Sequence, residues 1–180
     1  MDIRSYHRIV IVGSGGSGKS WLATRLADVT GLPLFHLDKE LWQPGWVMPP
    51  REQIIARQRQ IISGDSWIID GNYNDTMALR FAAADLVIFL DVNRVTCVMG
   101  AMRRAGKKRN DLPDFLQEPK VLSKDSIDFY KWIWQYPNTG RKAVFALHEQ
   151  YENTSFLHIH GRREMRQLVS QWRAQADCRA

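Results

Sequence analysis

The sequence predicts an α/β protein whose mostly parallel sheet is covered by helices on both faces. Short apolar segments alternate with longer segments of helical periodicity along the whole chain, as in a sheet built from strand–helix–strand units. The first apolar segment, residues 8–13, leads into a glycine-rich stretch that opens an amphipathic helix. A chain of 180 residues, 44% of them hydrophobic, is long enough for one well-buried core. We therefore expect a single domain spanning residues 1–180.

The strands are expected where short, continuous apolar runs occur, because a strand buried on both faces has no polar alternation. Five runs meet this description: residues 8–13, 34–38, 66–70, 85–91 and 155–160. Three of them end in an acid, namely Asp38, Asp70 and Asp91. Parallel α/β sheets bind ligands at the carboxyl ends of their strands, so these three acids are candidate site residues.

The helices are expected between and after these strands. We predict them at residues 18–30, 49–62, 75–83, 93–109, 120–136, 141–151 and 163–175. Trp21, Leu22, Leu26 and Val29 form one apolar stripe in the first helix. Asp75 and Asn93 are suitable N-caps, and residues 49 and 50 are prolines, which suit a helix start. Two prolines predict a loop over residues 110–119, and residues 137–140 are expected to stop or kink the aromatic helix.

Charge and composition exclude several classes of protein. The net charge of +6 suggests a polyanionic partner, whether nucleotide, nucleic acid or anionic lipid. Two cysteines, Cys97 and Cys178, cannot build a disulfide scaffold or a cysteine-based zinc site. The apolar runs are far shorter than the roughly 20 residues needed to span a bilayer, and no apolar signal segment follows Met1. We therefore expect a cytoplasmic protein without a membrane partner.

The glycine-rich stretch, GSGGSGKS, matches the pattern G-x-x-x-x-G-K-[ST] in full. Glycines allow the backbone to curl so that successive N–H groups point at phosphate oxygens, and the helix that follows adds its positive dipole end. Lys19 can reach the β- and γ-phosphates, and the Ser20 hydroxyl can bind Mg²⁺. We predict ATP and Mg²⁺ as cofactors, with the nucleotide held by Gly13, Ser14, Gly15, Gly16, Ser17, Gly18, Lys19, Ser20 and Trp21.

A nucleotide site of this kind needs a carboxylate that orients Mg²⁺ and its waters. Asp70 and Asp91 are both candidates, and a helix cap or loop role is the alternative for each. Asp70 is better placed if the third strand lies beside the first. Asp38 can accept a proton from a substrate hydroxyl or join the metal shell, or it can simply cap the segment that follows.

Residues 103–109 carry five positive charges and no acid. One interpretation is a solvated helix end, since cations favour a helix C-terminus. The other is a mobile lid, about residues 103–120, whose arginines Arg103, Arg104 and Arg109 neutralise a transferring phosphoryl group.

Aromatic residues are abundant for one small domain. Most of Trp42, Trp46, Trp132 and Trp134 are expected to be core or packing residues, and the alternative is that Trp42 and Trp46 line an acceptor pocket beneath the lid. In the second case Trp42 and Trp46 stack on a flat substrate, with Asn72 and Tyr73 as hydrogen-bonding partners. The histidines His36, His148, His158 and His160 lack metal-ligand spacing and are expected to be packing or surface residues.

Taken together, the segments GSGGSGKS, FHLD, LWQPGW, WIIDGNY, DLVIFLD and YKWIWQYP resemble a bacterial family described as DNA topology modulation proteins. That family is grouped with adenylate-kinase-like and other P-loop kinases, and the resemblance covers roughly residues 8–172. It implies a three-layer α/β/α P-loop nucleoside triphosphate hydrolase fold with a five-stranded parallel sheet in the order 2-3-1-4-5 and a short lid.

The resemblance also implies roles for individual residues. Asp70 and Gly71 are similar to the Asp-Gly of adenylate kinases, where the Asp holds water ligands of Mg²⁺. Arg80 corresponds to an acceptor-binding arginine, and Gly161 with Arg162 lies where these folds wrap backbone around adenine. The chain departs from adenylate kinases after Gly71, where Asn72-Tyr73-Asn74 replaces Phe-Pro-Arg.

Two functional hypotheses follow. The favoured one is a kinase that transfers the γ-phosphoryl of Mg-ATP to a small acceptor such as a nucleotide, a nucleoside or another metabolite. Asp38 is the base if the acceptor carries a hydroxyl, whereas Arg80 and Arg51 gain importance if it carries a phosphate. The alternative is an ATP-dependent, nucleic-acid-associated regulator that uses the basic residues at 103–109 and 162–166, although no DNA-reading module is evident.

Overall fold

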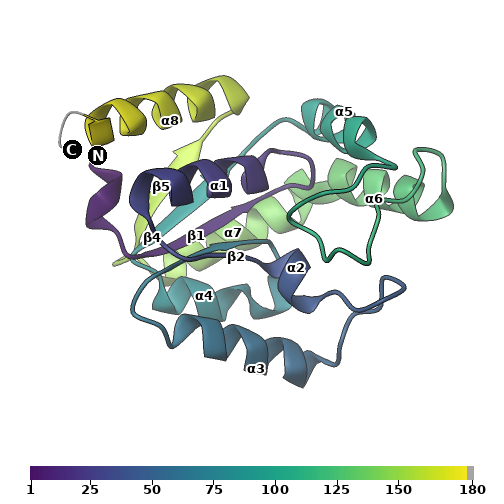
Figure 1. Cartoon of the computed structure of the whole chain (residues 1–180), viewed down its shortest axis with the longest axis horizontal. Helices are drawn as coiled ribbons and strands as arrows, with labels where there is room; N and C mark the ends of the chain where they lie inside the picture. Colours follow the sequence, from purple (N-terminus) through teal and green to yellow (C-terminus); the bar gives the residue numbers. More distant parts are fainter. Residues whose placement is uncertain (178–180) are drawn as a thin grey trace.

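The computed structural model describes residues 1–177; Cys178 lies outside the described residues. Its centre is a five-stranded parallel sheet in the order β2-β3-β1-β4-β5, which confirms the predicted order (Figure 1). The strands are β1 (Arg8–Gly13), β2 (Leu34–His36), β3 (Trp67–Asp70), β4 (Leu86–Leu90) and β5 (Ser155–Ile159).

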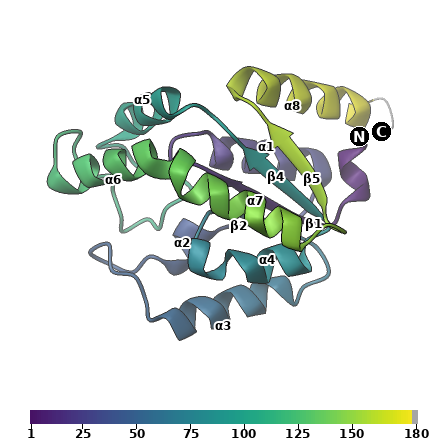
Figure 2. The ribbon, with the colours of Figure 1, turned by 180° about the vertical axis from the view of Figure 1, so that it is seen from behind.

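Helices cover both faces of this sheet, which gives the predicted three layers (Figures 1 and 2). The helices are α1 (Lys19–Thr30), α2 (Leu37–Leu41), α3 (Arg51–Ile62), α4 (Met77–Ala83), α5 (Arg94–Arg104), α6 (Lys124–Gln135), α7 (Gly140–Gln150) and α8 (Arg162–Asp177). Short 3₁₀ turns occur at Ile3–Ser5, Asn74–Thr76 and Tyr136–Asn138. One face packs on α1, α5 and α8, and the other on α3, α4 and α7.

The two layers of core follow from the alternation of side chains along each strand. In β1, Ile9 and Ile11 belong to the cluster that includes α1 and α8. Val10 and Val12 belong to the cluster that includes α4 and α7. All four are fully buried, so β1 lies at the centre of the molecule and holds the loop that follows Gly13 in a fixed place.

Several predicted boundaries shift. The second strand ends at His36, and Asp38 lies in the first turn of α2. Asp75 lies in a 3₁₀ turn and caps no helix, because α4 begins only at Met77. Asn93 does cap α5, and its side chain accepts a hydrogen bond from the Thr96 N–H. Trp21 was predicted on the buried stripe of α1 but is 41% exposed.

The segment between α5 and α6 is irregular. The helix predicted to reach residue 109 ends at Arg104, and the helix predicted from residue 120 begins at Lys124 with Ser123 as its N-cap. Residues 105–123, hereafter the α5–α6 segment, therefore form a longer loop than predicted. None of the helices within residues 1–177 combines the length and the apolar character that a membrane crossing requires.

Candidate functional site

The glycine-rich loop joins β1 to α1 in a tightly curled backbone. Gly16 and Gly18 have φ angles of 72° and 112°, in the left-handed region that favours glycine. A Cβ atom on Gly16 would also clash with the carbonyl oxygen of Cys97 in α5. The Lys19 side chain folds back over the loop, and its Nζ donates to the Ser14 carbonyl at 2.9 Å. The first turn of α1 leaves its N–H groups free of intrahelical partners, which is the geometry of an anion cradle.

Two polar side chains brace this loop from outside. The Asn72 Oδ1 atom accepts a hydrogen bond from the Gly13 N–H at 3.0 Å. Arg162, at the start of α8, donates to the carbonyl oxygens of Gly16 and Ser17. Asn72 and Arg162 were predicted to bind acceptor and nucleotide respectively. The structure gives both of them contacts that fix the loop.

A cavity of about 190 Å³ opens between the loop and the carboxyl ends of β2 and β3. It brings together many of the residues predicted from the sequence, from five separate parts of the chain. Its lining comprises Gly15, Lys19, Ser20, His36, Asp38, Trp42, Asp70, Gly71, Asn72, Tyr73, Arg104, Arg109, Asp111, Phe129 and Trp132.

Asp38 is held in this cavity by Tyr73, whose hydroxyl donates to Asp38 Oδ1 at 2.8 Å. Tyr73 adopts a left-handed backbone conformation with φ of 41°, and this turn points its ring toward α2. Burial raises the pKa of the Asp38 carboxyl, and the nearby Asp70 raises it further, whereas the bond from Tyr73 and the charge of Lys19 oppose the shift. The net pKa is higher than usual, which suits a general base.

Asp70 is buried at the end of β3 and keeps one oxygen unpaired. Its Oδ2 atom lies 3.0 Å from Nδ1 of His36, the residue directly beside it in the β2–β3 register. The Asp70 Oδ1 atom is buried and has no hydrogen-bond partner among residues 1–177. An unpaired buried carboxylate oxygen is costly, so this atom fits a site for a cation or a cation-bound water.

His36 was predicted to be an ordinary packing or surface residue, whereas the structure places it in the lining of the cavity, bonded to Asp70. Sequence reasoning missed it because its role depends on which strands are neighbours. The pairing of β2 with β3 indicates the contact between His36 and Asp70, since the last residues of two adjacent parallel strands lie side by side.

Lys19 faces both carboxylates. Burial lowers the pKa of its ammonium group, while the negative charges of Asp70 and Asp38 act in the opposite direction. Lys19 and the two carboxylates therefore lie close together in the cavity, whose lining also includes Arg104, Arg109 and Asp111.

The α5–α6 segment contributes a network of two arginines and two acids. Arg109 donates from Nε to Asp111 Oδ1 at 2.9 Å and also pairs with Glu118. Arg104 pairs with Glu118 at 3.1 Å. Burial acts to raise the pKa of Asp111, but Arg109 and a hydrogen bond with Ser20 more than offset it, so the pKa is lowered. The basic run thus has acidic partners, which lie just beyond it in sequence.

Aromatic rings enclose a second hollow of about 520 Å³ that shares Asp38, Arg104 and Arg109 with the first. Trp42 and Trp46 pack edge to face, with 5.3 Å between ring centroids, on a short hairpin closed by a Gln43–Val47 bridge. Phe129 of α6 forms the opposite wall. Trp132 stacks on Phe129 and lines the cavity, whereas Trp134 lies outside it under Arg94.

Five predicted site residues line neither of these two hollows. Arg51 is exposed and lines a separate hollow beside Asn72 and Tyr73. Arg103 is exposed in the last turn of α5 and faces neither hollow. Trp21 and Arg162 line a fourth hollow, which also includes Lys19 and Ser20, whereas Gly161 lines none of these four hollows.

Arg80 was predicted to bind the acceptor, but the structure buries it completely. Its guanidinium donates to the carbonyl oxygens of Gly71, at 3.1 Å, and Asn72. Burial lowers the pKa of Arg80 to about 9, which leaves it charged at neutral pH. Arg80 therefore supports the turn that carries Asp70, Asn72 and Tyr73, and it does not face the cavity.

We expect Arg80→Met to destabilise the protein by about 2–5 kcal/mol, because two buried carbonyl oxygens lose their donor. Arg51→Met, at an exposed position, is the matched control and should change stability by less than about 0.5 kcal/mol. Urea unfolding measures both. An Arg80→Met protein of unchanged stability would contradict the structural role.

The fold and the loop together define a three-layer α/β/α P-loop fold. Solved structures with similar folds include a shikimate kinase from Bacteroides thetaiotaomicron, at 16% identity and a TM-score of 0.55, covering 96% of this chain and 99% of that one. Another is the shikimate kinase from Acinetobacter baumannii in complex with shikimate, at 13% identity and a TM-score of 0.59, covering 94% and 92%. No protein-family model and no curated protein matches the sequence, so the resemblance to DNA topology modulation proteins stays a prediction.

Proposed function

We propose that this protein is a kinase that transfers the γ-phosphoryl group of Mg-ATP to a hydroxyl of a small acceptor. One observation carries the proposal: Lys19 of the phosphate-binding loop, Asp38 and Asp70 face the same cavity, and Arg104 and Arg109 close it from the other side. Phosphoryl transfer needs positioning and charge stabilisation more than covalent chemistry, and this arrangement supplies both.

The donor side is the glycine-rich loop and the start of α1. The amides of the loop and the Lys19 ammonium would bind the β- and γ-phosphates. The residues present fit Mg²⁺, because Ser20 and Asp70 both line this cavity and the Asp70 Oδ1 atom has no hydrogen-bond partner among residues 1–177. When bound, Mg²⁺ would supply positive charge that offsets the negative charge of the phosphate groups. His36 orients Asp70 through its bond to Oδ2.

The acceptor side favours a hydroxyl over a phosphate. A phosphate acceptor would require arginines in the cavity in addition to those that face the transferring group. Arg80 is buried behind the turn, and Arg51 lines a different hollow. Asp38, in contrast, lies in the cavity with a raised pKa and is oriented by Tyr73. It would accept the hydroxyl proton as the oxygen attacks the γ-phosphorus.

The aromatic hollow would hold the body of the acceptor. Trp42, Trp46 and Phe129 offer apolar ring faces, and Asp38, Arg104 and Arg109 stand where this hollow meets the cavity. A compact ring that carries hydroxyl groups fits such a lining. The arginines, now paired with Asp111 and Glu118, would turn to the transferring phosphoryl group.

The nucleic-acid alternative draws less support. Of the basic residues it relies on, Arg104 and Arg109 pair with acids within the α5–α6 segment, and Arg162 binds the glycine-rich loop. These three side chains have partners inside the fold, so the alternative would rest on the exposed cations of the two basic runs, such as Arg103, Lys107 and Arg163.

Acceptor-stimulated ADP release tests the proposal. Sugars, cyclic polyols including shikimate, nucleosides and nucleoside monophosphates are screened with Mg-ATP, and the product is identified by ³¹P NMR. We expect stimulation by a hydroxyl acceptor of one class, with a new phosphate ester in the product. Stimulation by monophosphates alone, with a diphosphate product, would contradict the hydroxyl assignment. Absence of stimulation by every class, together with binding of duplex DNA at physiological salt, would favour the alternative.

A further inference from the structure

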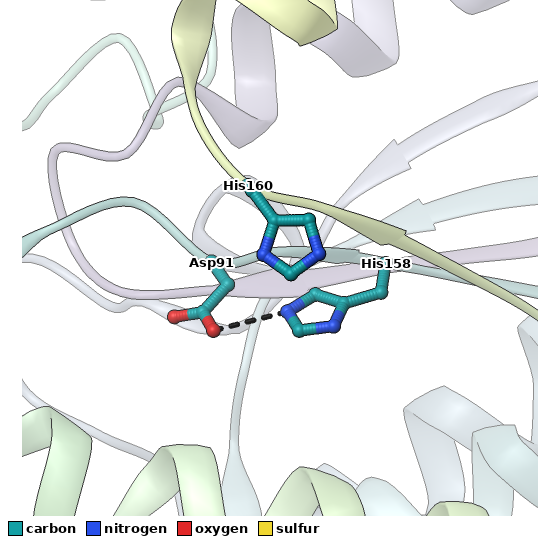
Figure 3. A group of neighbouring side chains, drawn as sticks. All are labelled: Asp91, His158 and His160. Atoms are coloured by element: carbon teal, nitrogen blue, oxygen red, sulfur yellow. Dashed lines mark hydrogen bonds and ion pairs between the residues drawn. The ribbon is translucent and has the colours of Figure 1, made fainter.

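A second cluster of ligating side chains lies outside the cavity, at the carboxyl ends of β4 and β5. It consists of Asp91, His158 and His160 (Figure 3). His158 Nε2 lies 3.0 Å from Asp91 Oδ2, and the rings of His158 and His160 are 3.9 Å apart between centroids. One ligating atom from each residue lies within 4.8 Å of the other two.

The sheet itself places these three residues together. The β4–β5 register pairs Phe89 with His158, and the Asp91 N–H donates to the Ile159 carbonyl at 2.9 Å. Residues two apart on a strand share a face, so His158, His160 and Asp91 all point to the side covered by α7. The His158 ring stacks on Phe89 at 5.1 Å, which fixes its orientation. The cluster therefore rests on a rigid part of the fold.

The donor set suits a borderline transition-metal dication. Two imidazoles and one carboxylate are ligands of Zn²⁺, Ni²⁺ and Cu²⁺, whereas Mg²⁺ prefers oxygen ligands. Bonds of about 2.0–2.2 Å in a tetrahedral site place neighbouring ligand atoms roughly 3.3–3.6 Å apart, so only small side-chain movements are needed. Asp91 and His158 are partly buried and His160 is exposed, which leaves an entry path and room for a water ligand.

One neighbour opposes the metal. Arg141, from the first turn of α7, donates from Nε to the same Asp91 Oδ2 at 2.9 Å. Its side chain is 41% exposed, so it can release Oδ2 without breaking core packing. A metal ion bound to Asp91 Oδ2 would replace the hydrogen bond from Arg141. Removal of the Arg141 guanidinium should therefore make metal binding tighter.

We propose that Asp91, His158 and His160 form a binding site for a zinc-class divalent metal ion, distinct from the site proposed for Mg²⁺. The two donor sets differ in chemistry, since Ser20 and Asp70 offer oxygen atoms and this cluster offers two ring nitrogens. His158 and His160 were expected from the sequence to be packing or surface residues, because their position beside Asp91 arises only from strand pairing.

Titration of the full chain with Zn²⁺ against a chromophoric chelator, after removal of bound metal with EDTA, tests this site. We expect His158→Gln and His160→Gln each to weaken Zn²⁺ binding at least tenfold, and Arg141→Gln to strengthen it. His148→Gln, at a histidine stacked on Phe156 outside the cluster, is the matched control and should bind as the wild type does. Asp70→Asn should also keep this affinity, since it removes an acid of the other cavity.

The position of the ion provides the second readout. Anomalous diffraction at the zinc absorption edge should show a peak between Asp91, His158 and His160. The proposal is overturned by equal Zn²⁺ affinity in the wild type and both histidine variants, by no binding at 100 µM Zn²⁺, or by an anomalous peak confined to the Asp38–Asp70 cavity. Far-ultraviolet circular dichroism of each variant separates loss of metal from loss of fold.

Discussion

Lys19→Ala is expected to weaken Mg-ATP binding by about 100-fold or more while the fold is retained. A charge-assisted hydrogen bond contributes about 1.5–3 kcal/mol, and Lys19 would make such bonds to two phosphates. The side chain stabilises little in the free protein, where its Nζ donates to the Ser14 carbonyl. Burial lowers the pKa of Lys19, so at pH values below that pKa the charged side chain destabilises the folded state. Removing the side chain should therefore leave the free energy of unfolding equal or higher.

Calorimetry with a non-hydrolysable ATP analogue and Mg²⁺ measures the affinity, and urea unfolding measures the stability. Lys39→Ala is the matched control, because Lys39 is an exposed lysine in α2. An unchanged dissociation constant in Lys19→Ala would contradict the phosphate-binding role. An unfolded variant would mean that Lys19 is a structural residue.

Asp38→Asn is expected to lower kcat by about 10²–10⁴-fold, the usual contribution of a general base, with little change in ATP affinity. The amide oxygen can still accept the hydrogen bond from Tyr73, so the geometry of the turn should persist. Asp65→Asn, at an exposed acid, is the control. A kcat within twofold of the wild type would exclude Asp38 as the base.

The raised pKa of Asp38 also predicts two pH effects. Activity should rise with pH as Asp38 ionises, with an apparent pKa above the ordinary 3.8. A carboxyl whose pKa is raised on folding contributes stability that is present below its unfolded pKa and lost as pH rises through its folded pKa. The asparagine side chain of Asp38→Asn does not ionise, so this variant keeps that contribution to stability at every pH. The variant should therefore be more stable than the wild type at pH 7, and the difference should shrink toward pH 4.

Urea unfolding at both pH values measures the difference in stability. An Asp38→Asn protein that is less stable than the wild type at pH 7 would show that the Asp38 charge is stabilised by its surroundings.

Local sequence signals were sufficient to predict the alternation of strands and helices, whereas the strand order was implied by the resemblance to a family of P-loop kinases. The loop motif fixes one strand–turn–helix unit, and continuous apolar runs mark each further strand, because burial on both faces removes polar residues. The loop residues could be assigned to the site from the motif, and Asp70 could be assigned because parallel strands place their carboxyl ends along one edge. Asp91, which follows β4, lies outside the cavity.

Contacts that arise from pairing between distant segments were not predicted from the sequence. His36 meets Asp70 only because β2 lies beside β3, and Asp111 reaches Ser20 only because the α5–α6 segment folds back over the loop. Arg80 illustrates a different limit. The turn after Gly71 is Asn72-Tyr73-Asn74, with Tyr73 in a left-handed conformation, and it directs two carbonyl oxygens to Arg80. The role transferred from adenylate kinases therefore does not fit this chain.

The structure of the protein crystallised with Mg²⁺ and a non-hydrolysable ATP analogue tests the central claim most directly. We predict that the terminal phosphate lies between the amides of residues 14–20 and Lys19, with Arg109 moved from Asp111 to that phosphate and Asp38 facing its open side. Density for the analogue anywhere else, with residues 13–20 empty, would contradict the account.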